Sequence, residues 1–308
     1  MTTEFAARGN HKLIVKTIHT LSADFCSSQN TSMRKGGLIG LASMAIGLGP
    51  NQIEQHLNGL VRPVLSCMGE QQDKYLRFYA TEALLNVAKV ARDNILPFFN
   101  DIFVVMSKIV TDLDTKVRVC AELVNTLLKD IITESPDFKT ESFIPTLKQC
   151  MSTKDPFGRT FCIGWIQAMH VVRNPTLNNH LPEILDPLFA FLTDPKPEIV
   201  NQAKRELVGF LSKLKARTPE PEVFTLMTNS LVGHVQSKHS HVQLMSIIWI
   251  RAFVEISGLA LYPYISRILA AILPNLNHSE ELWKSLGRQE YNSEFILFMN
   301  LFICLGII

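Results

Sequence analysis

Four arginines recur along the sequence in similar surroundings, and a guanidinium group is suited to binding carboxylates or phosphates through paired hydrogen bonds. They are Arg34, Arg77, Arg118 and Arg159, and Lys35 adds a fifth cation beside the first. Two interpretations are open. In the first, which we favour, each arginine binds a carboxylate or a helix-end carbonyl of an adjoining structural unit. In the second, the five cations are candidate partner-binding residues.

Other residue groups that could do chemistry have simpler structural explanations. Gly36–Gly40 lacks the Gly-Lys-Ser/Thr ending of a phosphate-binding loop, so close helix packing explains its glycines better. His234, His239 and His241 are near one another, but no cysteine or carboxylate completes a recognisable metal set, and a solvated turn is favoured. The sequence shows no carboxylate pair or nucleophile signature. We therefore predict no catalytic residue, no metal and no cofactor, and a protein that is not an enzyme.

The overall charge argues against nucleic acid as a partner. The chain has 30 basic and 28 acidic residues and a formal net charge of +2, whereas phosphate backbones are bound by a basic stripe. One helical stretch is locally basic through Lys204, Arg205, Lys213, Lys215 and Arg217. A solvated helix face is the default explanation of this stretch, and contact with acidic headgroups or an acidic partner is the alternative.

A repeat of 41 residues indicates what positions the arginines. Similar patterns begin, each 41 residues after the last, at Leu76, Val117, Gly158 and Ile199. The pattern recurs with a slip of two residues at Met33 and Val242. In three copies an aspartate stands three residues before the pattern: Asp73, Asp114 and Asp155. A carboxylate at this place can cap the first turn of a helix, so each pattern is predicted to begin a helix.

Each copy continues with the spacing of an amphipathic helix. Apolar or small residues recur at i+4, i+7 and i+11, except at Glu206 in the copy that begins at Ile199, and a second apolar helical segment precedes each copy. The i+4 residue is small throughout, which allows close packing: Gly37, Ala80, Ala121, Cys162, Ala203 and Ser246. Paired helices of this period are typical of HEAT and armadillo repeats, which must stack to bury their apolar stripes. The sequence predicts an all-α solenoid of stacked antiparallel helix pairs.

We expect the array to occupy residues 1–283 in about six units. Beyond Ser285 the apolar spacing fails, because Glu290 and Glu294 fall where apolar residues are expected. Residues 295–308 are nearly all apolar but too short for a membrane-spanning helix, which needs about 20 residues. Residues 284–308 are therefore expected to be a divergent, buried or aberrant tail, and a membrane tail anchor is the alternative. The six cysteines contain no C-x-x-C pair and indicate a reducing compartment such as the cytosol.

Several segments, taken in order, resemble one protein family. The most specific is MRKGGLIGLA at residues 33–42, followed by LRFYA at 76–80, LLKDI at 127–131 and LPEILD at 181–186. Over roughly residues 12–283 the sequence resembles the vacuole-morphology HEAT-repeat scaffolds, which are the adaptors of the PIKfyve lipid-kinase complex. A general HEAT-repeat adaptor, such as a transport receptor, is the alternative.

The resemblance implies a non-catalytic, cytoplasmic scaffold that is peripheral on endosomal or vacuolar membranes. Members of the family hold a phosphatidylinositol 3-phosphate 5-kinase together with a Sac-type phosphoinositide phosphatase, and so control phosphatidylinositol 3,5-bisphosphate. Their amino-terminal array is associated with the kinase. Their carboxy-terminal part, used for self-association and phosphatase attachment, has no counterpart in this sequence, so the resemblance supports these two interactions of this chain less strongly than kinase binding.

Overall fold

The computed structural model describes residues 10–69, 73–171, 175–216, 220–257 and 263–276. These residues contain helices and short connections without a strand, which confirms the prediction of an all-α fold. The chain divides into two compact units, Met1–Pro175 and Thr176–Ile308, which we describe separately. The predicted tail at 284–308 lies outside the described residues, and the expectation of one array over 1–283 stays a prediction.

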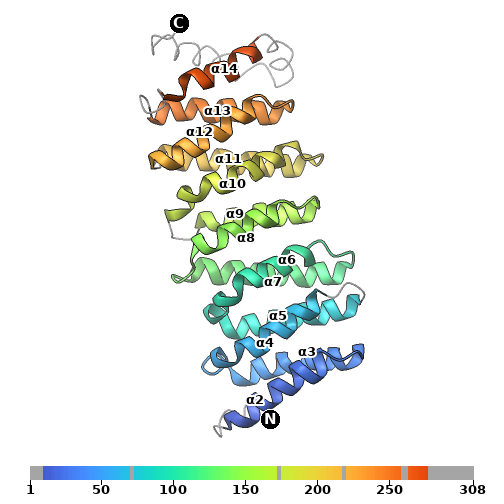
Figure 1. Ribbon diagram of the computed structural model, residues 1–308. Helices are drawn as coiled ribbons and strands as arrows, with labels where there is room; N and C mark the ends of the chain where they lie inside the picture. Colours follow the sequence, from blue (N-terminus) through green and yellow to red (C-terminus); the bar gives the residue numbers. More distant parts are fainter. Residues whose placement is uncertain (1–9, 70–72, 172–174, 217–219, 258–262, 277–308) are drawn as a thin grey trace. The chain divides into compact units, whose positions relative to one another are not determined.

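The first unit consists of paired helices in two layers (Figure 1). Its elements are α2 (His11–His19), the π-helix η1 (Thr20–Cys26), α3 (Thr31–Leu48), the 3-10 helix η2 (Glu54–His56), α4 (Leu57–Met68), α5 (Lys74–Ala91), the 3-10 helix η3 (Arg92–Phe98), α6 (Phe99–Ile109), α7 (Thr115–Glu134), α8 (Thr140–Met151) and α9 (Pro156–Val171). The first helices of the pairs, α2, α4, α6 and α8, pack in series. The second helices, α3, α5, α7 and α9, pack likewise, as the repeat predicts.

The second unit continues the same pairing. Its elements are η4 (Pro175–His180), α10 (Leu181–Ala190), η5 (Phe191–Thr193), α11 (Pro197–Ala216), α12 (Pro221–Val235), α13 (Ser240–Ser257) and α14 (Ile265–Leu276). Helices α10, α12 and α14 pack in series as first helices, and α11 packs on α13 as second helices. The turns between first and second helices lie at one end of the pairs, and these turns position most of the polar side chains discussed below.

Aspartate caps begin α5, α7 and α9 as predicted, and an asparagine cap that the sequence analysis did not predict begins α3. Asp73 Oδ1 accepts hydrogen bonds from the backbone N–H groups of Tyr75, at 2.8 Å, and Leu76, at 3.1 Å. The side chains of Asn30, Asp114 and Asp155 each accept two hydrogen bonds of the same kind. Because the first N–H groups of a helix have no partner within it, these caps fix where each helix begins and which residues face the core.

The predicted apolar stripe is buried. In α5 the side chains of Leu76, Ala80, Ala83 and Val87 are each at most 2% exposed. The stripe departs from the pattern at Glu206 of α11, where the neighbouring Leu207 and Phe210 are fully buried and supply the apolar face. In the first unit α6, α8 and α9 contribute an aromatic cluster, in which the Phe103 and Phe143 ring centroids are 4.7 Å apart.

Close helix packing explains the glycines of α3. A Cβ atom on Gly37 would lie 2.8 Å from both Cys26 Sγ and Phe25 Cβ, and one on Gly40 would lie 2.6 Å from a Leu21 methyl group. These distances are shorter than van der Waals contact allows, so only glycine lets η1 approach α3 this closely. The structural interpretation of Gly36–Gly40 is therefore confirmed for Gly37 and Gly40.

Candidate protein-interaction surface

The five cations singled out in the sequence lie at the start of the second helices, next to the turns that precede them. Arg34 and Lys35 belong to α3, and Arg77, Arg118 and Arg159 occupy the corresponding turn of α5, α7 and α9. All five side chains are half-buried. The fold therefore brings them to equivalent places in consecutive repeats. The contacts of the arginines hold the turns in place.

Arg77 binds across to the adjoining repeat. Its Nη2 donates a hydrogen bond of 3.0 Å to Asp112 Oδ1, and its Nε bonds the other carboxylate oxygen at 2.5 Å. The Arg77 side chain is 14% exposed and that of Asp112 is 5% exposed. The hydrogen bond to Asp112 raises the pKa of Arg77, so the guanidinium remains charged. This contact joins α5 to the turn before α7, as the favoured interpretation predicts.

The other arginines bind backbone carbonyls. Arg118 donates to the carbonyls of Asp112 and Leu113, the latter at 3.1 Å. Arg159 Nε donates to Thr153 O at 3.1 Å, and Arg34 Nε donates to Cys26 O at 3.2 Å. These three bonds stay within one repeat, because a guanidinium one turn into a helix reaches the preceding turn. Arg34 Nη2 also lies 3.8 Å from Cys67 Sγ of α4 in the adjoining repeat. The predicted bond to a carboxylate or carbonyl of the adjoining repeat is thus confirmed for Arg77, and partner binding by the five cations stays a prediction.

Two lysines connect successive helix caps. Lys35 Nζ lies 3.6 Å from Asp73 Oδ2, and Lys74 Nζ lies 3.2 Å from Asp114 Oδ2. Both ammonium groups also lie near the ring of Tyr75, at 5.1 and 5.3 Å from its centroid. Desolvation acts to raise the pKa of Asp73, but hydrogen bonds from Leu76 and Tyr75 and the charge of Lys35 lower it overall. The turn edge of the first unit is thus a charged border around an exposed aromatic ring.

Exposed apolar side chains on the second helices were missed by the sequence analysis. Six in the first unit are 52–59% exposed: Ile39, Ile46, Tyr75, Val119, Leu123 and Phe157. Met33, at 40%, and Val171, the last residue of α9, at 69%, are also exposed but are left outside this set. We call these six residues the second-helix face. In α7, Val119 and Leu123 are one turn apart and lie opposite the buried Val117 and Ala121. Apolar side chains gathered on adjacent helices are typical of protein-interaction surfaces.

A sequence signal for this face did exist. Ile39 and Leu123 both stand six residues after the first position of their repeats, Met33 and Val117. This position lies outside the i, i+4, i+7, i+11 stripe, so an apolar residue there is not explained by the core. The signal is weak in any single repeat, because isolated exposed apolar residues are common in folded proteins.

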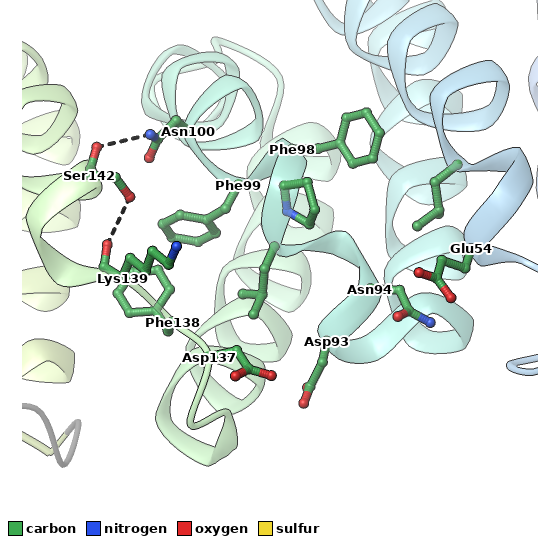
Figure 2. A pocket seen from close by; sticks show the side chains of 13 residues that line it. Glu54, Asp93, Asn94, Phe98, Phe99, Asn100, Asp137, Phe138, Lys139 and Ser142 are labelled. Carbon is green, nitrogen blue, oxygen red and sulfur yellow. Dashed lines mark hydrogen bonds between the residues drawn. The ribbon is translucent and has the colours of Figure 1, made fainter.

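The turns at the opposite ends of the second helices enclose a groove in the first unit. Its volume is about 720 Å³, and Figure 2 shows its lining side chains from η2, η3 and the turn before α8. Glu54, Asp93 and Asp137 give the lining three carboxylates, against one cation, Lys139. The groove is thus acidic, and its charge differs from that of the turn edge with the five cations.

The described residues offer little catalytic geometry. They contain no group of three or more His, Cys, Asp or Glu side chains that could hold a metal ion. Ser230 and His234 of α12 both contact the same oxygen of Asp186 in α10, His234 Nε2 at 2.8 Å. This arrangement joins two first helices and differs from a serine–histidine–aspartate relay, in which the histidine lies between the other two. None of the described helices is both long and apolar enough to span a membrane.

The paired helices, their caps and the second-helix face define an α-solenoid scaffold of the HEAT/armadillo class. Residues 32–130, nearly all of the segment from α3 to α7, match the family described as "Vacuolar 14 Fab1-binding region". The protein VAC14 homolog of Arabidopsis thaliana is 39% identical over 281 residues, covering 91% of this chain and 37% of that protein. The chain belongs to the VAC14 family.

Two further comparisons concern a second relative and a solved structure. The vacuole morphology and inheritance protein 14 of Saccharomyces cerevisiae is 33% identical over 230 residues, covering 62% of this chain and 26% of that protein. The chain therefore spans well under half the length of either relative. Among solved structures, a computationally designed armadillo repeat protein for modular peptide recognition is 15% identical in sequence, with a TM-score of 0.40. The match covers 78% of this chain and 99% of the designed protein.

Proposed function

We propose that this chain is the kinase-binding segment of a non-catalytic scaffold and that it binds a Fab1-type phosphatidylinositol 3-phosphate 5-kinase through the second-helix face. The proposal rests on one coincidence. Five of the six residues of this face, all except Phe157, fall within residues 32–130, which match the Fab1-binding region. Helices α3, α5 and α7, which carry these five residues, pack side by side.

The physical argument is the cost of leaving these side chains in water. Fully burying a Val, Leu or Ile side chain contributes about 1.5–3 kcal/mol, so a few of them at the centre of an interface can dominate its affinity. Lys35 and Lys74, beside Tyr75, supply a polar border. An apolar centre with a charged border is the common anatomy of a protein interface.

In the cell, kinase binding by this segment would contribute to the control of phosphatidylinositol 3,5-bisphosphate on the cytoplasmic side of endosomal and vacuolar membranes. The relatives' names, which refer to the vacuole and its morphology, support this placement. The proposal covers the kinase alone and assigns no surface of this chain to a Sac-type phosphatase.

The test is a pull-down of the Fab1-type kinase of the same organism with the full chain and with the double variant Val119→Asp, Leu123→Asp. Both side chains are more than half exposed, so the variant is expected to keep the wild-type melting temperature. Two buried carboxylates at the interface should weaken kinase binding by about a hundredfold or more. Val208→Asp, at a residue 50% exposed on α11 of the second unit, is the matched control and should bind like wild type. Undiminished binding by the double variant would refute the proposed face.

A further inference from the structure

The second unit contains a cavity whose lining is rich in hydrogen-bond donors. Its volume is about 320 Å³, and it lies between the first turns of α11 and α13 and the turn before α11. Asn201 and Lys204 line it from α11, and His239, Ser240 and His241 line it from the start of α13. The sequence analysis assigned His239 and His241 to a solvated turn. His239 is indeed exposed, but His241 is half-buried in the first turn of α13.

Two residues of this lining, Lys204 and His241, contact each other although 37 residues separate them. Lys204 Nζ lies 3.2 Å from His241 Nδ1. An ammonium group can only donate, so Nδ1 must accept, and the proton of the neutral imidazole is then on Nε2. Each side chain therefore keeps at least one N–H group for a further acceptor. Within the described part of the chain, neither side chain forms an ion pair with a carboxylate.

The pKa directions agree with this geometry. Burial lowers the pKa of Lys204, and burial together with the charge of Lys204 lowers the pKa of His241. Both directions are those expected of basic groups that are partly desolvated and have no anion beside them. An anion bound between them would favour the charged form of each.

The carboxylate in the lining does not supply that anion. Asp194 is 8% exposed, and its Oδ1 accepts the Lys196 N–H at 2.7 Å before α11. Glu198, in the first turn of α11, is exposed to solvent and is not part of the lining. The first turn of the 18-residue helix α13 adds backbone N–H groups that have no partner within the helix and the positive end of its dipole. The lining thus presents several hydrogen-bond donors, and its carboxylate is already hydrogen-bonded.

We propose that this cavity binds a phosphate monoester, with Lys204 and His241 as the principal donors and Ser240 and Asn201 beside them. A phosphate monoester fits because its three terminal oxygens can accept from several converging donors at once, whereas a carboxylate offers two. The volume of the cavity suits a small polar group. The site lies in the second unit and is independent of the proposed kinase-binding face.

Two sources share this chemistry, a soluble phosphate ester and a phosphomonoester lipid headgroup. The soluble source is tested by titrating the full chain with inorganic phosphate and with inositol 1-phosphate, following the imidazole NMR signals. Saturable shifts of the His241 signals are expected. Lys204→Gln should weaken binding by about tenfold or more, the loss of one charged hydrogen bond. The control Arg205→Gln removes an exposed cation on the same helix that is not in the lining, and should change binding by less than about twofold.

The lipid source is tested by cosedimentation with phosphatidylcholine vesicles that contain either phosphatidic acid or phosphatidylserine. A preference for phosphatidic acid that Lys204→Gln abolishes identifies a headgroup site, and binding of the soluble esters alone identifies a soluble ligand. Absence of binding to every probe, or equal losses in Lys204→Gln and Arg205→Gln, would overturn the proposal. If Lys204→Gln lowers the melting temperature, His241→Asn combined with Ser240→Ala provides the same comparison.

Discussion

Asn125 Oδ1 accepts a hydrogen bond of 2.8 Å from Trp165 Nε1, and this bond joins α7 to α9 across 40 residues of sequence. The two residues are 3% and 0% exposed, so neither group has water as an alternative partner. Their separation is nearly one repeat period. The bond therefore joins equivalent positions of two consecutive second helices. It fixes how the two helices align along their lengths more specifically than apolar packing alone does.

Loss of this bond should destabilise the first unit. Asn125→Ala leaves the Trp165 N–H unpaired in the core and should lower the free energy of unfolding by about 1–3 kcal/mol. Trp165→Phe should also destabilise, and the double variant should lose less than the sum of the two, with a coupling energy of about 0.5–3 kcal/mol. Urea denaturation of the four proteins measures this coupling, and strictly additive effects would show that the bond contributes nothing.

The ion pair between Arg77 and Asp112 should contribute far more to the free energy of unfolding than an ion pair on the surface. Arg77→Met leaves the carboxylate of Asp112, only 5% exposed, without its cation. This variant should lower the free energy of unfolding by about 3–5 kcal/mol. Arg92→Met removes a pair with Glu134 of 2.7 Å whose side chains are 46% and 66% exposed, and should cost at most about 1 kcal/mol. Thermal melting of both variants compares them directly, and equal losses would contradict the structural role assigned to Arg77.

Alanine substitutions at two adjacent glycines of α3 should change the stability of the protein in opposite directions. Gly37→Ala places a Cβ atom 2.8 Å from Cys26 Sγ and should destabilise by about 1–3 kcal/mol through overpacking. Gly36 has no atom within 4 Å of such a Cβ, so Gly36→Ala should stabilise the helix by about 0.5–1 kcal/mol. Melting temperatures that fall for both variants, or rise for both, would argue against the close approach of η1 to α3.

Acid should destabilise the chain partly through the cap of α5. The folded-state pKa of Asp73 lies below its ordinary value of 3.8, so its contribution is complete above that value and is lost as the pH falls through the folded pKa. Asp73→Asn keeps an oxygen for the cap but does not titrate. Wild type should therefore lose more stability than Asp73→Asn between about pH 6 and about pH 3, as measured by urea denaturation. Parallel losses would assign the acid sensitivity to other carboxylates.

The sequence by itself determined the local features of this protein. The helix caps and the buried apolar stripe depend on chemistry within one or two helical turns, so they can be recognised directly from the repeat in the sequence. The caps are Asp73, Asp114 and Asp155, and the stripe is that of α5. Such short-range rules hold in any fold that contains the helix. The all-α class and the pairing of helices followed from their recurrence.

Only the tertiary structure decided what the recurring side chains contact. Arg77 reaches Asp112 in the next repeat, whereas Arg118, at the same place in its own repeat, folds back onto carbonyls of the preceding turn. The pairing of Lys204 with His241 was likewise invisible in the sequence, and the second-helix face left only a weak signal there. These contacts depend on how neighbouring helices are offset and rotated, which is set by packing summed over many residues far apart in the chain.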